Sequence, residues 1–233
     1  MTTLPVVAVT SFSIAVTLGA YVLSLCARKR YPSPLTTPVL FSTVIIIAVL
    51  LGSGISFAGY GPAKDIMTFL LGPATVALAL PLYKNRQVFF KNIIPAGCGL
   101  LAGSLGTMII AGLTARILGF TPVLTSSIAI KSTTVPIAVE IAKIVHGAPA
   151  LTAIFVVITG MLGASLGPWL MNRAGITHPV SRGLALGTIS HGQGTAEAIA
   201  EGQLCGAVAG VAIAFGAVCT SVTAPYLVPL LAG

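Results

Sequence analysis

The chain has 233 residues, of which 56% are hydrophobic and only 7% are charged. A soluble domain carries about 25% charged residues, so these charges are too few to cover a folded globule in water. Intrinsic disorder is excluded as well, because it requires low hydrophobicity. The net charge of +8 comes from basic residues at the ends of apolar segments, which is typical of topology signals rather than a nucleic-acid surface. The composition indicates an integral membrane protein without a nucleic-acid partner.

The apolar residues form long continuous blocks, which predicts helices that span a lipid bilayer. Aromatic residues make up 6% of the chain, too few for the aromatic girdles of an outer-membrane barrel. We therefore expect an all-α, polytopic helical bundle that forms one transmembrane domain over residues 1–233. In chain order, the expected spans are 4–27, 39–57, 66–83, 92–118, 149–171 and 204–231.

Basic clusters and Pro- or Gly-rich stretches separate the first spans. The first span ends at Arg28-Lys29-Arg30, and a Pro-rich connector follows it. The second span is expected to stop in the Gly- and Pro-containing stretch 59–62, and Gly72-Pro73 interrupts the third.

The fourth span is rich in glycine, which predicts close helix packing. Small residues let helices approach each other in lipid, and Gly99, Gly103 and Gly106 offer such a face. The chain is also short for a membrane protein that needs both a moving unit and a fixed scaffold. We therefore expect a homodimer.

Two further segments are too polar at their centres to be ordinary spans. Residues 121–146 are apolar at both ends but contain Lys131-Ser132-Thr133-Thr134-Val135-Pro136. Residues 183–203 contain a Gly-, Ser- and Thr-rich centre around His191. We expect both segments to be broken or re-entrant inside the protein.

The charge pattern supports this expectation for residues 121–146. By the positive-inside rule, the basic clusters at 28–30, 84–91 and 173–182 all lie in the cytoplasm, with the N-terminus outside. The chain must then cross the membrane an even number of times between 84–91 and 173–182. The spans 92–118 and 149–171 already give two crossings. Residues 121–146 must therefore enter and leave the membrane on the same side. A single kinked helix is the alternative.

A weak internal similarity indicates a repeat. Residues 74–80 align with residues 133–139, with Thr, Val and Ala in common. Paired broken segments are typical of secondary transporters built from inverted repeats. We therefore expect an inverted repeat and an elevator-like architecture.

Lys131 is the most informative residue of the chain. An ammonium in the middle of an apolar segment is costly, and Pro136 breaks the helix close by. Ser132, Thr133 and Thr134 add hydroxyl groups, and a half-helix N-terminus adds free backbone N–H groups. This pattern favours a carboxylate-binding site. The alternative is that Lys131 snorkels from a helix end and that the hydroxyl groups cap the helix.

The second polar centre is Ser190-His191-Gly192-Gln193-Gly194-Thr195. Glycines let two backbones approach closely, and irregular backbone at membrane depth is tolerated where it lines a cavity. His191 can donate a hydrogen bond to an anion or carry a proton near neutral pH, although a purely structural histidine remains the alternative. Glu197 and Glu201 are expected at an aqueous rim.

Motifs of enzymes are missing from the sequence. It contains no H-E-x-x-H, no G-x-S-x-G and no Walker A sequence. The four cysteines have no C-x-x-C spacing. We therefore expect no enzymatic activity, no cofactor and no metal site, and any transport would be secondary or driven by a separate subunit.

Together, residues 131–138 and 187–196 resemble the motifs of the LrgB/CidB family. Residues 73–83 resemble its P-A-x-V-A-L-A-x-P-L-Y segment, and the resemblance covers essentially the whole chain. It implies transport of small monocarboxylates such as pyruvate, glycolate, glycerate or lactate, or else antiholin-like regulation of murein hydrolase export and cell lysis. It also implies a multi-pass protein of the bacterial plasma (inner) membrane and a smaller LrgA/CidA-type membrane partner.

The residues that match the family motifs form the candidate site of this chain. A regulator has no need for ionisable groups beside broken helices, so the sequence favours transport over regulation. The expected substrate-binding residues are Lys131, Ser132, Thr133, Thr134, His191, Gly192, Gly194 and Thr195, with Thr75 from the earlier segment.

Overall fold

The computed structural model describes residues 3–77, 79–84 and 86–233, which form helices and connecting turns without a strand. The chain divides into two compact units, Met1–Ala77 and Leu78–Gly233. The all-α fold class predicted from the sequence is confirmed, and the assignment of residues 1–233 to one domain stays a prediction.

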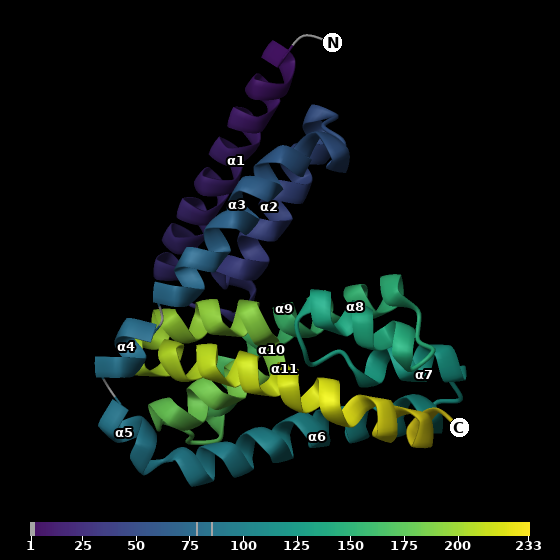
Figure 1. The fold of residues 1–233 in the computed structure, drawn as a ribbon. Helices are drawn as coiled ribbons and strands as arrows, with labels where there is room; N and C mark the ends of the chain where they lie inside the picture. The colour runs from purple at the N-terminus through teal and green to yellow at the C-terminus, as the bar shows by residue number, and fades with distance from the viewer. Residues whose placement is uncertain (1–2, 78, 85) are drawn as a thin grey trace. The chain divides into compact units, whose positions relative to one another are not determined.

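The first unit contains three helices and one short turn (Figure 1). Helix α1 (Thr3–Arg30) contacts both α2 (Pro38–Ser53) and α3 (Phe57–Ala77), and the 3-10 turn Pro34–Thr36 joins α1 to α2. A hydrogen bond of 2.9 Å joins the hydroxyl groups of Thr17 and Tyr60, which fixes α1 against the start of α3.

Two predictions about this unit were wrong. Gly72-Pro73 was expected to interrupt the third span, but Pro73 lies inside α3. The stretch 59–62 was expected to end a span, but it lies inside α3, with Pro62 within the helix. Proline removes one backbone hydrogen bond, and membrane helices tolerate it because neighbouring helices and polar side chains compensate. Here the hydrogen-bonded Tyr60 side chain lies in the same turn and ties it to α1.

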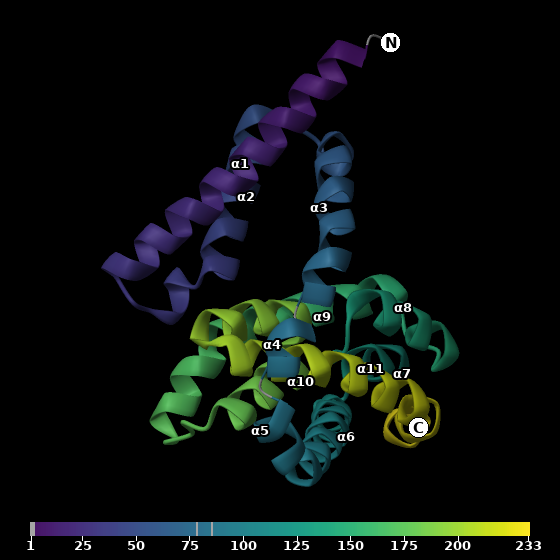
Figure 2. The ribbon, with the colours of Figure 1, turned by 60° about the vertical axis from the view of Figure 1, so that its left-hand side comes forward.

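The second unit is built around helix α11, which contacts α4, α6, α7, α8 and α10. Figures 1 and 2 show α11 running along α10 within this unit. Its elements are α4 (Ala79–Lys84), α5 (Arg86–Lys91), α6 (Ile93–Ile117), α7 (Pro122–Ala129), α8 (Val135–Ile144), α9 (Pro149–Arg173), α10 (Pro179–Glu201) and α11 (Gln203–Ala232).

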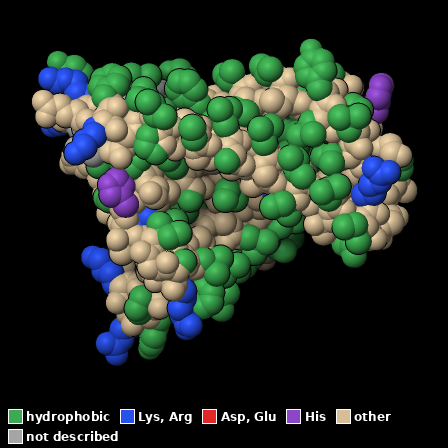
Figure 3. Space-filling view, turned by 90° about the horizontal axis from the view of Figure 1, so that it is seen from below, with side chains coloured by type: hydrophobic (Ala, Val, Ile, Leu, Met, Phe, Trp, Pro, Cys, Tyr) green, Lys and Arg blue, Asp and Glu red, His purple; other side chains and the backbone are tan. Residues whose placement is uncertain are grey.

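Four of the described helices are long and apolar enough to cross a membrane. They are α1 over Val6–Arg30, and α6, α9 and α11 over their full lengths. Helix α2 is apolar but has only 16 residues, or about 24 Å, which is shorter than a typical hydrocarbon core. The face in Figure 3 agrees with a lipid environment, because hydrophobic side chains are spread across it.

Helix α10 is not one straight rod, because its backbone breaks at His191, where φ is 43° and ψ is −127°. A straight helix would separate Arg182 from Glu201 by about 28 Å, yet their side chains form an ion pair with an Nε–Oε2 distance of 2.7 Å. The two halves of α10 therefore fold back on each other. We call this element the α10 hairpin, with its tip at His191 and its base at Arg182 and Glu201.

The segment of α7 and α8 also doubles back. The backbone N–H of Ala148 donates a hydrogen bond of 2.8 Å to the Ser127 hydroxyl, across 21 residues of chain. Between the two helices, residues 130–134 are not helical. Both segments that the sequence predicts to be broken are thus broken, close to the residues singled out for their polarity.

Candidate functional site

The first part of the site is the non-helical stretch between α7 and α8. Pro136 occupies the first turn of α8, where its missing N–H costs nothing, and Thr134 is the residue that precedes the helix. The first N–H groups of a helix have no partner inside it and carry a partial positive charge. Helix α8 thus begins directly beside Thr133 and Thr134.

The second part is the tip of the α10 hairpin. The positive φ of His191 is uncommon for a residue that is not glycine, and such backbone strain persists only where the surroundings enforce it. The Nε2 atom of His191 lies 3.2 Å from the backbone oxygen of Lys131. This contact joins the tip of the α10 hairpin to the stretch between α7 and α8.

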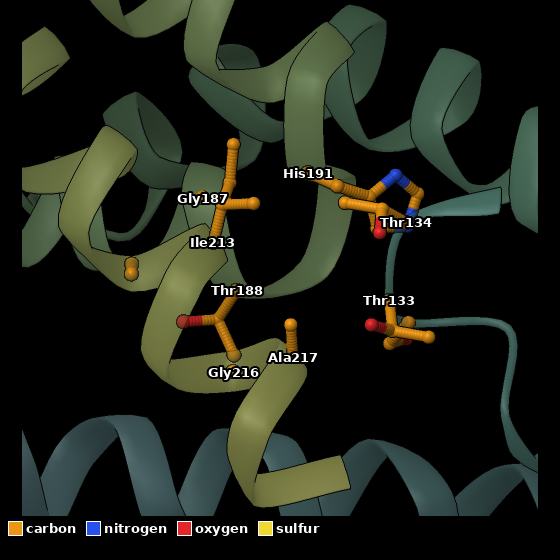
Figure 4. Close-up of a pocket in the computed structure, with 10 residues that line it drawn as sticks. Thr133, Thr134, Gly187, Thr188, His191, Ile213, Gly216 and Ala217 are labelled. Carbon is orange, nitrogen blue, oxygen red and sulfur yellow. The ribbon is translucent and has the colours of Figure 1, made fainter. Parts of the chain in front are cut away.

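A small cavity lies between these two parts and helix α11 (Figure 4). In this conformation the cavity is too tight to admit a water molecule. Ser132, Thr133 and Thr134 line it from one side, and His191 with part of α10 lines another. The remaining lining residues are Gly187 and Thr188 of α10 and Ala212, Ile213, Gly216 and Ala217 of α11.

Two hydroxyl groups of this lining have no hydrogen-bond partner. Thr133 is 3% exposed and Thr188 is 5% exposed, and the Oγ1 atom of each is buried without a partner. Figure 4 shows the Thr133 hydroxyl on the side that faces Ala217. A buried unpaired hydroxyl is costly, and native proteins usually satisfy such groups. The cavity therefore offers unused donors to a polar ligand.

The predicted residue Lys131 occupies a different place from its neighbours. Its ammonium lies 3.4 Å from the Ser132 hydroxyl and forms no ion pair with the described residues. Its side chain does not line the small cavity but borders two mostly apolar cavities, one beside α6 and one beside α9. Only its backbone oxygen contacts His191.

The predicted residues of α10 have different surroundings. Gly192 is exposed and a side chain there would meet nothing within 4 Å, whereas Gly194 lies against the backbone of Leu186 in the other half of the hairpin. Thr195 is buried, and its hydroxyl has no partner, but it does not line the cavity. The side chain of Thr75 lies outside the described residues.

Thr188 is a lining residue that the sequence-based site did not include. Its Cγ2 atom lies 3.4 Å from the position that a Cβ atom would take at Gly103 of α6. Gly103 was predicted to pack against a second copy, but in this structure it lets α6 approach α10. The only sequence signal for Thr188 was its place among the glycines and hydroxyl residues around His191.

Comparison with known proteins covers nearly the whole chain. The model of the LrgB-like family matches residues 17–230. This protein belongs to the LrgB-like family. YxaC of Bacillus subtilis (strain 168) is 37% identical over 215 residues, which are 92% of this chain and 94% of that protein. No solved structure matches.

Of two further relatives, one carries a functional name. The "Holin-like protein CidB" of Staphylococcus epidermidis is 30% identical over 217 residues, 93% of this chain and 95% of its own length. YwbG of Bacillus subtilis (strain 168) is 31% identical over 219 residues, 94% and 97% of the two chains. The resemblance to the LrgB/CidB family is therefore confirmed.

Proposed function

We propose that this LrgB-like protein is a secondary transporter of small monocarboxylates such as pyruvate, glycolate, glycerate or lactate. The observation that supports it is the cavity between two broken helical segments, with two buried hydroxyl groups that lack partners. Sites of secondary transporters are typically formed by discontinuous helices.

The chemistry of the lining suits a carboxylate. The hydroxyl groups of Thr133 and Thr188 can each donate a hydrogen bond, and one ring nitrogen of His191 can donate when it carries a proton. The N-terminus of α8 adds unpaired N–H groups and a partial positive charge. Because the cavity has no room for a water molecule in this conformation, binding of a substrate would need one of the broken segments to move.

The order of helices supports an inverted, elevator-like arrangement. Helix α9 follows the α7–α8 segment and α11 follows the α10 hairpin, so one broken segment and one long helix occur twice in succession. If α9 crosses the membrane once, the two broken segments enter from opposite faces as re-entrant segments. The second unit would then be the moving part, because it contains both broken segments, and the first unit would be the scaffold.

Labelling of single cysteines tests this topology. We expect Gln87→Cys and Ala174→Cys to react only from the cytoplasmic side and Ala150→Cys only from the outside, in a protein whose exposed Cys26 and Cys98 are replaced by serine. A membrane-impermeant maleimide applied to intact and to inside-out vesicles measures the side. Opposite accessibility of positions 87 and 174 would rule out the re-entrant arrangement.

A second candidate function is antiholin-like regulation of murein hydrolase export and cell lysis. The relatives described above favour it more directly than transport, because the name of the Staphylococcus protein is holin-like and none of these three names mentions a carboxylate. The transport proposal depends on the cavity, for which a regulator would have no use.

Uptake of labelled acids into proteoliposomes that contain only this protein distinguishes the two functions. We expect wild-type protein to take up a small monocarboxylate. Lys131→Met should weaken its apparent affinity by at most about tenfold, because the ammonium lies outside the cavity lining, next to Ser132, and attracts a bound anion through its charge alone. Unchanged affinity would mean that Lys131 only snorkels. Absence of uptake by wild type, together with altered autolysis in cells that lack the protein, would favour regulation.

The surroundings of the protein complete the proposal. We expect it to be a multi-pass protein of the bacterial plasma membrane that works with a smaller LrgA/CidA-type membrane protein. A homodimer also stays a prediction. Gly99 and Gly106 of α6 have open space around them, so these two positions, without Gly103, remain available for contact with a second copy.

A further inference from the structure

The two ends of the α10 hairpin are joined by an ion pair with two points of contact. Arg182 Nε donates to Glu201 Oε2 at 2.7 Å, and Arg182 Nη2 donates to Glu201 Oε1. The two side chains are only 11% and 18% exposed. Two-point contacts of this kind fix orientation as well as distance.

The same guanidinium also reaches the end of α9. Arg182 Nη1 donates to Asn172 Oδ1 at 2.9 Å and to the backbone oxygen of Ile176 at 2.8 Å. One side chain therefore connects both halves of the α10 hairpin with α9 and the loop that follows it. We call Arg182 and Glu201 with these contacts the base clamp.

We propose that the base clamp is a positioning device that holds Thr188 and His191 at the cavity. Thr188 lies on the half of α10 that begins near Arg182, and His191 connects this half to the one that ends at Glu201. At the tip, the halves are joined through a single strained residue, so their separation depends on contacts elsewhere. If the base opens, the two halves pivot about the tip, which moves Thr188 relative to the cavity and changes the backbone angles and ring orientation of His191.

The α8 helix offers a matched control. Glu140 and Lys143 form a one-point ion pair, and their side chains are 68% and 57% exposed. Exposed one-point pairs of this kind contribute little, whereas the Arg182 guanidinium makes four hydrogen bonds, two of them to Glu201. Glu140→Gln therefore makes the same chemical change as Glu201→Gln where no positioning is expected.

Distance measurement between spin labels tests the clamp without any ligand. Labels at Ser181→Cys and Ala200→Cys, both exposed, report the separation of the two halves at the base. The full chain in nanodiscs is used, with Cys26 and Cys98 replaced by serine. We expect one narrow distance distribution for the otherwise unchanged protein. Glu201→Gln should broaden it and add longer distances.

Two more variants keep the test decisive. Arg182→Lys keeps the charge but loses the two-point contact, so it should give intermediate broadening even if Glu201→Gln does not fold. Glu140→Gln should leave the distribution unchanged. A narrow, unchanged distribution in Arg182→Lys, or equal broadening in Glu140→Gln, would overturn the proposal.

The second readout is binding of pyruvate or glycolate, and it rests on the proposed transport function. We expect the affinity to fall about tenfold in Arg182→Lys with no change in Glu140→Gln, because small displacements of positioned groups weaken binding strongly. If the distances change but wild-type protein binds neither acid, the transport proposal fails and the clamp stands. If the distances change and the affinity does not, the clamp does not position the site.

Discussion

Gly194→Ala should open the α10 hairpin and lower the thermal unfolding midpoint by roughly 10 °C. A Cβ atom at this position would lie 2.1 Å from the backbone oxygen of Leu186 and 2.6 Å from the Cβ of Ser190. The overlap with backbone cannot be relieved by a side-chain rotation, so the two halves must separate. Unfolding of the purified protein in detergent, followed by loss of the monodisperse peak on heating, measures the effect.

Gly192→Ala is the control for this prediction. Position 192 lies two residues away in the same hairpin, and a Cβ atom there would meet nothing within 4 Å. We expect its unfolding midpoint to equal that of wild type or to rise slightly, because alanine stabilises a helix relative to glycine. Equal destabilisation by both substitutions would contradict the fold of α10 described above.

Thr133→Val should separate stability from ligand binding. The Thr133 hydroxyl is buried without a partner, so replacing it by a methyl group removes an unpaired polar group, and the unfolding midpoint should stay constant or rise. The same change removes a hydrogen-bond donor from the cavity. If the proposed transport function holds, affinity for the monocarboxylate should fall about tenfold, in line with one lost hydrogen bond to a charged group.

The matched control is Thr152→Val. The Thr152 hydroxyl is also buried without a partner, but it belongs to α9 and does not line the cavity. We expect the same effect on stability and no effect on affinity, measured by scintillation proximity binding or by uptake. If both variants lose affinity to a similar degree, or if neither loses affinity, the cavity is not the binding site.

The helical elements could largely be predicted from hydropathy, because the bilayer thickness sets the length of a spanning helix. The predicted spans 92–118 and 149–171 match α6 and α9 to within two residues at either end. The prediction for the stretch 59–62 was wrong because Gly and Pro end helices more often in soluble proteins than in membrane proteins. The break at His191 lies within the segment that was too polar for an ordinary span.

The details of the site could be predicted only in part. Ser132, Thr133, Thr134 and His191 come together as expected, because hydroxyl and imidazole groups are unusual in apolar segments. The separate surroundings of Gly192 and Gly194 depend on which side of the hairpin each one faces, and the sequence does not reveal this. The base clamp escaped notice because Arg182 and Glu201 become neighbours only when the chain turns back between them. Glu197 was expected at an aqueous rim and is buried instead.

For the transport function proposed above, the lining of the small cavity has an energetic consequence. None of its ten residues is a carboxylate or an ammonium, so nothing in the lining cancels the charge of a bound monocarboxylate. The loaded and empty protein therefore differ by one elementary charge when they cross the membrane potential. Moving one charge costs about 2.3 kcal/mol per 100 mV. Under the proposed transport function, accumulation of the acid anion inside a negatively polarised cell would then need a co-transported proton or other cation, whereas the potential itself would favour export of the anion.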